Sequence, residues 1–343
     1  MTANLIDLYS DTVSRPSPGM RQAIAEAEVG HEQAGEDPTT NRLQEMAAEL
    51  LGKEAALLLP SGTMCNQIAF RAVCEPGDEI LLDKTAHPLH YETGGPAALS
   101  GAMTRALDGE RGIFSADQVR DAIRTRGGHY PISKVLSVEN TSNGGGGSVW
   151  PLEQIAEVTD AAHEKGLKTH MDGARLLNAV VASGIPAATY AKNFDSLWIC
   201  LSKGLGCPMG GVLAGTRDFI DRAWRFKHQF GGAMRQSGIV AAAGIYALEN
   251  NVDRLADDHA NARHLAMLIA DIPGIAVEPV ETNMVFFDVA GTGKTAAEVS
   301  EALLSHGVRI GANTATRMRA VAHIDVDRAG IEAAAAALRE VVG

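Results

Sequence analysis

The sequence has few cysteines, few aromatic residues and a shortage of positive charge. Its 343 residues contain four cysteines, 5% aromatic side chains, and 30 lysines and arginines against 42 aspartates and glutamates. The cysteines show no C-x-x-C spacing, and a chain of this length does not need disulfides for stability. We therefore expect a protein of the reducing cytoplasm whose cysteines are Cys65, Cys74, Cys200 and Cys207.

The charge and the absence of long apolar runs exclude several kinds of partner. A formal net charge of -12 repels the phosphates of nucleic acids and of anionic lipids. No window approaches the roughly 18 uninterrupted apolar residues of a membrane-spanning helix. The first residues, MTANLIDLYSD, lack the cationic and apolar runs of a secretory signal. We expect a small-molecule partner, and no nucleic acid or membrane.

Predicted strands alternate with predicted helices along most of the chain. Gly52 ends a helical pattern that begins at residue 41, and Gly166 ends another that begins near Pro151. Such alternation is typical of an α/β fold in which helices cover both faces of a mostly parallel sheet. The short apolar runs that we assign to strands are 55–60, 78–83, 134–140, 168–172, 196–202 and 210–215.

Changes in pattern divide the chain into three parts. Residues 1–20 are extended and interrupted by proline and glycine, so we expect an arm that lies on another part of the protein. Residues 21–250 carry the alternating pattern and form the predicted large domain. Residues 251–343 begin with a charged segment and form a predicted smaller α+β domain.

Lys203 stands at the end of an apolar run and directly precedes a glycine. Lysine is almost never buried without a partner, so a lysine at the end of a buried strand is a candidate for Schiff-base chemistry. The alternative is a side chain that extends from the strand end into solvent. Asp172 also ends a predicted strand, and Arg175 follows it closely. Ligands of open α/β sheets lie outside the carboxyl ends of the strands, so these three residues are expected at one crevice.

The segment LLLPSGTMCNQIAF predicts a strand, a glycine turn and a helix. The helix would begin at Gly62 and Thr63, where free N–H groups and the helix dipole favour a phosphate. The same pattern is also an ordinary helix cap. The segment HPLHYETGG contains His87, His90 and Glu92, yet no further ligands complete a metal site, and we predict none. An imidazole there could instead lie on a flat cofactor ring.

Eight segments together resemble one enzyme family. Their order along nearly the whole chain is similar to that in the L-threonine aldolases of the low-specificity type, which are beta-eliminating-lyase relatives with the fold type I architecture of aspartate aminotransferase and with pyridoxal 5'-phosphate as cofactor. The segments are GEDPTTNRLQ, SGT, AHPLHYETGG, ENTSN, HMDGARLLNA, SKGLGCPMG, GGAMRQSG and RAVAHIDV.

The resemblance implies roles for individual residues. Lys203 matches the lysine that forms a Schiff base with the cofactor, Asp172 the carboxylate at its pyridine nitrogen, and His87 the imidazole on its ring. The remaining matches are Gly62 and Thr63 at the phosphate, Arg235 supplied to the phosphate from a neighbouring subunit, and Ser10, Arg175 and Arg319 around the substrate carboxylate. Bidentate guanidinium pairing would fix the orientation of that carboxylate.

Two positions depart from the family pattern. Ser142 stands in ENTSN where the family usually has histidine, and Ala34 stands before GEDP where it usually has tyrosine. The histidine is associated with recognition of the substrate hydroxyl, so we expect residue 142 to influence the choice of substrate side chain.

The resemblance implies an aldehyde-lyase that cleaves an L-β-hydroxy-α-amino acid, such as L-threonine or L-allo-threonine, to glycine and an aldehyde. Either His87, or a water held by Glu92, could accept the hydroxyl proton. β-Elimination or transamination on the same scaffold is the alternative. The resemblance also implies a homodimer or homotetramer with shared active sites.

Overall fold

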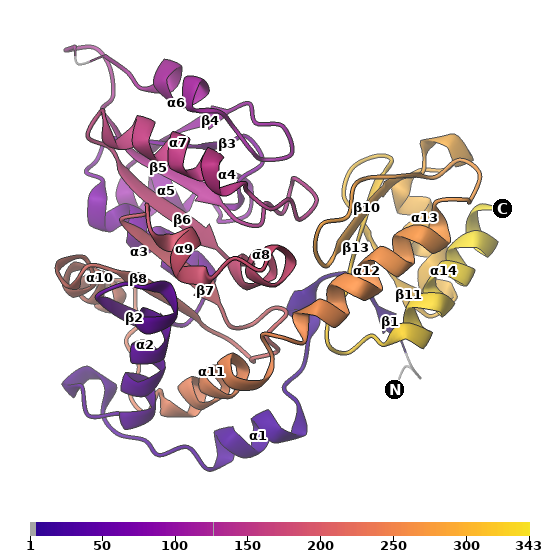
Figure 1. The fold of residues 1–343 in the computed structure, drawn as a ribbon, viewed down its shortest axis with the longest axis horizontal. Coiled ribbons are helices and arrows are strands. Elements are labelled where there is room, and N and C mark those ends of the chain that lie inside the picture. Colours follow the sequence, from indigo (N-terminus) through magenta and orange to yellow (C-terminus); the bar gives the residue numbers. More distant parts are fainter. Residues whose placement is uncertain (1–4, 126) are drawn as a thin grey trace.

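A seven-stranded sheet forms the centre of the larger part of the protein (Figure 1). The structure is a computed structural model that describes residues 5–125 and 127–343, so the first four residues of the predicted arm lie outside it. The strands follow the order β2-β8-β7-β6-β5-β3-β4. They are β2 (Ala55–Leu59), β3 (Glu79–Asp83), β4 (Met103–Leu107), β5 (Ser133–Glu139), β6 (Lys168–Gly173), β7 (Ser196–Cys200) and β8 (Gly211–Gly215).

The prediction of a mostly parallel sheet is confirmed. Strands β4, β3, β5, β6 and β7 are parallel, and β8 runs antiparallel to both β7 and β2. The sequence did not predict β4. Only Leu107 of this edge strand is buried, so the strand lacks the apolar run that marks its neighbours.

Helices cover both faces of this sheet. Side chains alternate between the two faces of a strand. In β2, Leu58 accordingly packs in a different apolar cluster from Leu57 and Leu59. The helices of this part are α1 (Pro18–Ala25), α2 (Pro38–Leu51), α3 (Gly62–Val73), α4 (His87–His90), α5 (Gly95–Ser100), α6 (Ala116–Ala122), α7 (Leu152–His163), α8 (Leu176–Ser183), α9 (Ala187–Ala191), α10 (Arg217–Gln229) and α11 (Gly238–Asn250).

The C-terminal part has its own antiparallel sheet, of order β12-β13-β10-β9. Phe287, Met318 and Leu338 are among the buried residues of its separate apolar cluster. Its elements are α12 (Leu255–Ile269), β9 (Ala276–Val277), β10 (Met284–Asp288), α13 (Ala296–Ser305), β11 (Val308–Arg309), β12 (Gly311–Ala312), β13 (Arg317–Val321) and α14 (Arg328–Val342). The exact division into 21–250 and 251–343 stays a prediction.

The N-terminal segment connects the two parts. Strand β1 (Ile6–Asp7) pairs in parallel with β11 of the C-terminal part, and α1 packs on α11 of the larger part. In Figure 1 the indigo segment between them passes from one part to the other. It therefore brings residues 8–17 to the junction of the two parts.

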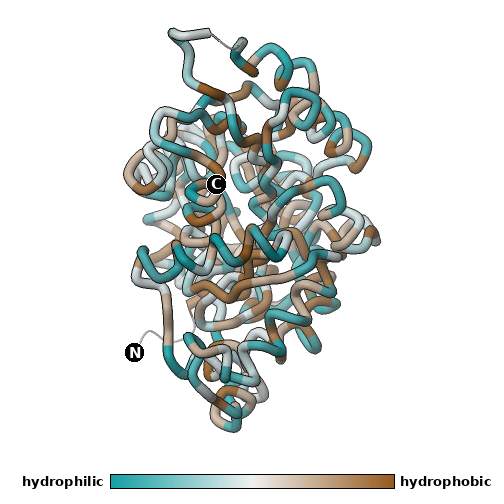
Figure 2. Tube along the Cα trace, turned by 90° about the vertical axis from the view of Figure 1, so that its left-hand side faces the viewer, coloured by the Kyte–Doolittle hydropathy of each residue, from teal (hydrophilic) through white to brown (hydrophobic). Residues whose placement is uncertain are grey.

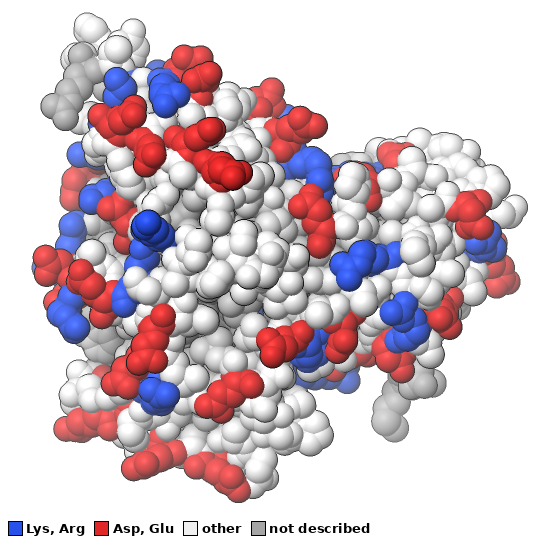
Figure 3. Space-filling model, viewed as in Figure 1, with Lys and Arg blue, Asp and Glu red and all other residues white. Residues whose placement is uncertain are grey.

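Apolar and charged side chains are distributed as the composition of a globular protein predicts. Apolar residues gather toward the interior of the trace in Figure 2, and the outer helices are largely hydrophilic. On the face shown in Figure 3, acidic and basic side chains are interspersed. Within residues 5–125 and 127–343, no helix is both long enough and apolar enough to cross a membrane.

Candidate active site

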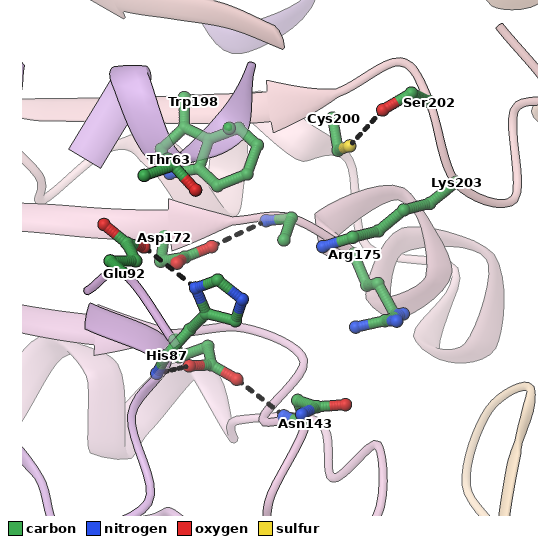
Figure 4. Close-up of a pocket in the computed structure, with 13 residues that line it drawn as sticks. Thr63, His87, Glu92, Asn143, Asp172, Arg175, Trp198, Cys200, Ser202 and Lys203 are labelled. Atoms are coloured by element: carbon green, nitrogen blue, oxygen red, sulfur yellow. Dashed lines mark hydrogen bonds and ion pairs between the residues drawn. The ribbon is translucent and has the colours of Figure 1, made fainter. Parts of the chain in front are cut away.

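Three neighbouring strands place chemistry-bearing residues at one edge of the central sheet. Glu139 ends β5 and lies beside Asp172 of β6 in the register of the sheet, and Lys203 follows the end of β7. The carboxyl ends of parallel strands meet at one edge, which explains why these residues converge. The pocket there (Figure 4) is lined by Gly62, Thr63, His87, Glu92, Glu139, Asn143, Asp172, Ala174, Arg175, Trp198, Cys200, Ser202 and Lys203.

Asp172 is buried and held from two sides. Its Oδ2 accepts a hydrogen bond from Asn66 Nδ2 at 2.8 Å, and its Oδ1 accepts one from the backbone of Ala174 at 3.0 Å. Lys203 extends into the same pocket from the loop after β7 (Figure 4), and its Nζ lies 6.0 Å from the centre of the Trp198 ring. The pocket thus combines a fixed carboxylate with an amine on a flexible side chain.

His87 lies on the other side of the pocket in the one-turn helix α4. Its Nδ1 is 2.9 Å from Glu92 Oε1, and the Glu92 side chain is completely buried. Burial alone would lower the pKa of His87, but the hydrogen bond to Glu92 and the charge of Asp172 outweigh it, and the pKa is raised. A carboxylate at Nδ1 fixes the proton there and leaves Nε2 as the group that can accept a proton.

Glu139 is a buried carboxyl group that the sequence analysis did not assign. Its two oxygens accept the backbone N–H groups of His87, at 2.8 Å, and Asn143, at 2.6 Å. Burial and the charge of Asp172 raise its pKa to about 7. Glu139 therefore positions two pocket residues and is itself poised to change charge near neutral pH.

The start of α3 forms another wall of the pocket. Ser61 caps the helix by accepting a hydrogen bond from Met64 N, and Gly62 and Thr63 open its first turn. A Cβ at Gly62 would lie 2.2 Å from the Trp198 ring, so only glycine allows this approach. The N–H groups at this end are those that favour an anion.

Two guanidinium groups border an adjoining hollow. Ser10, Arg175 and Arg319 line it together with His87 and Lys203. Burial and the neighbouring charge of Arg175 lower the pKa of Arg319. The Nη1 of Arg319 donates to Asn143 Oδ1 at 2.9 Å. Two adjacent cationic groups beside a hydroxyl can bind a carboxylate.

Two of the predicted site residues lie away from these hollows. Ser142 is buried, its Oγ accepts a hydrogen bond from Gly145 N at 3.2 Å, and it packs against Gly112 rather than lining the pocket. Arg235 is exposed on the segment after α10 and lines neither hollow within the chain. The structure brings together the other predicted residues, which are Ser10, Gly62, Thr63, His87, Glu92, Asp172, Arg175, Lys203 and Arg319.

These groups fit pyridoxal phosphate. Lys203 offers an amine, Asp172 a carboxylate for a protonated ring nitrogen, and the start of α3 a seat for a phosphate. The small side chain of Ala174 lines the same pocket, and the missing Cβ of Gly62 lets the ring of Trp198 form its wall. Within the described residues, no three His, Cys, Asp or Glu side chains gather as a metal site.

Comparisons with known proteins agree with this fit. Residues 7–292 match the model of the family described as beta-eliminating lyase. The low-specificity L-threonine aldolase of Escherichia coli K12 is 44% identical over 325 residues, which cover 94% of this chain and 95% of that protein. A threonine aldolase of Leishmania major superposes with a TM-score of 0.84 at 19% identity and covers 98% of this chain and 99% of that one. A structure of SPT with pyridoxal phosphate gives a TM-score of 0.76 at 16% identity, with coverage of 98% and 86%, and thus shares the fold. The chain therefore belongs to the beta-eliminating lyase family and, within it, to the low-specificity L-threonine aldolases.

Proposed function

We propose that this protein cleaves L-threonine, L-allo-threonine or a related L-β-hydroxy-α-amino acid to glycine and an aldehyde. The observation that carries the proposal is the paired arrangement of two hollows, one with Lys203 and Asp172 and the other with Arg175 and Arg319. The first suits the cofactor, and the second suits the carboxylate of an amino acid. Membership in the threonine aldolase family supports the same reaction.

Five residues would hold the cofactor. Lys203 would bind it covalently, Asp172 would keep its pyridine nitrogen protonated, and His87 would lie on its ring. Gly62 and Thr63 would bind its phosphate at the start of α3. When bound, pyridoxal phosphate supplies a sink for the electron pair of the bond that breaks.

The second hollow would orient the substrate. Arg175 and Arg319 would bind its carboxylate, with Ser10 donating a further hydrogen bond. A fixed carboxylate sets which bond at Cα is aligned for cleavage. Carbon–carbon cleavage also requires a base for the β-hydroxyl proton. The Nε2 of His87 suits this step because Glu92 occupies the Nδ1 side of the ring.

Arg235 supports an oligomer with shared active sites. It is exposed and outside both hollows of its own chain, whereas the family pattern would place it at a cofactor phosphate. A homodimer or homotetramer in which Arg235 reaches the site of a partner would reconcile these facts. The four cysteines are all buried and unpaired, which suits a cytoplasmic protein.

The products formed from L-threonine, L-allo-threonine and L-phenylserine test the proposal. Glycine and the matching aldehyde are expected, whereas a 2-oxo acid with ammonia would indicate elimination. Lys203→Ala should abolish both turnover and the visible absorption of the lysine-bound cofactor. A purified protein that binds no pyridoxal phosphate would overturn the proposal.

A further inference from the structure

Asn66 is a buried amide at the centre of the polar network behind the pocket. It lies one helical turn after Gly62 in α3 and is fully inaccessible to solvent. Its Nδ2 donates to Glu92 Oε1 at 2.7 Å and to Asp172 Oδ2 at 2.8 Å. Its Oδ1 accepts from Trp198 Nε1 at 2.7 Å and bonds His170 Nε2 at 3.2 Å. The amide has two donors and two acceptor positions, and all four are used.

The partners of Asn66 fix the direction of every bond in this network. Two carboxylates can only accept, and the indole of Trp198 can only donate, so the orientation of the amide is determined. The Nε2 of His170 therefore carries a proton and donates to Asn66. The Nδ1 of His170, 2.9 Å from Ser196 Oγ, accepts from that hydroxyl. Because every donor in this network has an acceptor and the direction of each hydrogen bond is fixed, the network holds its side chains in one geometry.

One amide group thus bridges two carboxylates that serve different parts of the site. Asp172 faces the position proposed for the pyridine nitrogen, and Glu92 fixes Nδ1 of His87. Neighbouring buried carboxylates repel each other, and a donor shared between them offsets that repulsion. Loss of the donor would leave one oxygen of each carboxylate without this partner, so either could gain a proton or turn away.

We propose that Asn66 is a positioning residue that couples Asp172 to the Glu92–His87 pair and so aligns the two ends of the active site. This inference rests on the proposed function. Asn66 does not line either hollow, so it would act through its partners and touch neither the substrate nor the reacting atoms. The substrate carboxylate depends on Arg175 and Arg319, which Asn66 does not contact.

The adjacent residue supplies a matched control. Gln67 is also buried in α3, and its Nε2 donates to the other oxygen of Glu92, Oε2. Gln67 has no hydrogen bond to Asp172 in the described structure. Asn66→Asp and Gln67→Glu are therefore equivalent isosteric changes of a Glu92 partner, and only the first also disturbs Asp172.

The experiment compares cofactor recognition in the full-length wild type and both variants. Each protein, freed of cofactor, is titrated with pyridoxal phosphate and with its analogue that carries carbon in place of the ring nitrogen. The dissociation constant of the analogue divided by that of pyridoxal phosphate reports the contact between Asp172 and the ring nitrogen. Loss of a bridge between charged groups should reduce this ratio by about ten-fold or more in Asn66→Asp, but by less than about three-fold in Gln67→Glu.

Kinetics and folding complete the test. Asn66→Asp should lower kcat for L-threonine while KM changes by less than about three-fold, since the substrate carboxylate clamp is intact. Circular dichroism establishes whether each variant is folded. If Asn66→Asp does not fold, Asn66→Ala takes its place in both measurements. Equal cofactor ratios in the Asn66 and Gln67 variants would overturn the coupling. A wild type that binds pyridoxal phosphate and cleaves threonine would leave the proposed function intact in that case.

Discussion

Asp11 holds the guanidinium of Arg175 by two parallel hydrogen bonds, from Nε to Oδ2 and from Nη2 to Oδ1, each 2.7 Å long. Both side chains are buried. Burial would raise the pKa of Asp11, but Arg175 overrides it and holds the pKa well below the ordinary value. The N-terminal segment thus supplies the counter-charge that fixes an arginine of the proposed carboxylate clamp.

Asp11→Asn should destabilise the protein by about 3 kcal/mol, because it leaves a buried guanidinium without its counter-charge. It should also raise KM for the amino acid, since Arg175 would lose its fixed orientation. Urea unfolding and steady-state kinetics measure these effects. Asp271→Asn removes the charge from an exposed pair with Arg339 and should leave stability close to that of the wild type. Equal destabilisation by the two changes would contradict the prediction.

Gly62→Ala should weaken both stability and cofactor binding. The new methyl group would lie 2.2 Å from the ring of Trp198, which is buried and tied to Asn66 by its indole N–H. Overpacking of this kind costs about 1–3 kcal/mol, and relief of the clash would displace the first turn of α3. Denaturant unfolding and a titration with pyridoxal phosphate measure the two effects.

Gly128→Ala is the control for the loss of a glycine. A Cβ there meets no heavy atom within 4 Å, so stability should change by less than about 0.5 kcal/mol. If Gly62→Ala retains wild-type stability and cofactor affinity, the close approach of α3 to Trp198 is not needed for the phosphate seat.

The sequence was sufficient to predict the central sheet apart from its edge strand β4, and to bring together much of the candidate site, because strand ends in a parallel sheet must meet. Lys203 and Asp172 end apolar runs, and that pattern alone places them at one edge. Glu139 also ends a strand, but its importance depends on the register that puts it beside Asp172. Asn66 lies in a helix whose sequence pattern is ordinary, and its role appears only when four side chains from three other segments converge on it.

The structure brings neither Ser142 nor Arg235 to the two hollows of the chain, and the reasons differ. Ser142 follows the end of β5, as Lys203 follows the end of β7, yet its hydroxyl bonds Gly145 N within the turn and does not line the pocket. Its influence on substrate choice stays a prediction, and any such effect would have to pass through the loop that it supports. Arg235 would need a second copy of the chain to reach a site, as the family resemblance implies, and its role there stays a prediction.

His170 should make the protein less stable in acid. Burial lowers its pKa to about 4 from the ordinary 6.5, so the unfolded chain binds this proton first as the pH falls. The contribution of neutral His170 to the free energy of unfolding is fully present above pH 6.5. It is lost as the pH falls through 4, by about 3 kcal/mol in total. The difference in unfolding free energy between wild type and His170→Gln should therefore shrink by about this amount between pH 7 and pH 4.

Urea unfolding at a series of pH values measures this difference on the cofactor-free protein. His306→Gln, at an exposed position, controls for the general loss of a histidine. A difference between wild type and His170→Gln that is constant across the series would show that His170 is protonated equally in the folded and unfolded chains.

Glu139 should have the opposite effect on stability. Burial and the charge of Asp172 raise its pKa to about 7 from the ordinary 4.5, so the folded state retains this proton when the unfolded chain has released it. The stabilisation is fully present below pH 4.5 and is lost as the pH rises through 7, again by about 3 kcal/mol. The free-energy difference between wild type and Glu139→Gln should fall over this interval in the same urea series.

The Glu139 variant also tests the link between the two hollows. Glutamine keeps one oxygen for either His87 N or Asn143 N, but turns an amide N–H group toward the other. Because Asn143 holds Arg319, the variant should raise KM for the amino acid as well as lower kcat. Glu79→Gln, at another buried glutamate that Arg124 pairs with, is the matched control and should leave KM unchanged within about two-fold. The difference in unfolding free energy between wild type and Glu139→Gln could instead grow between pH 4.5 and pH 7. In that case the folded protein prefers the ionised carboxylate, and a permanent charge holds the backbone of His87 and Asn143.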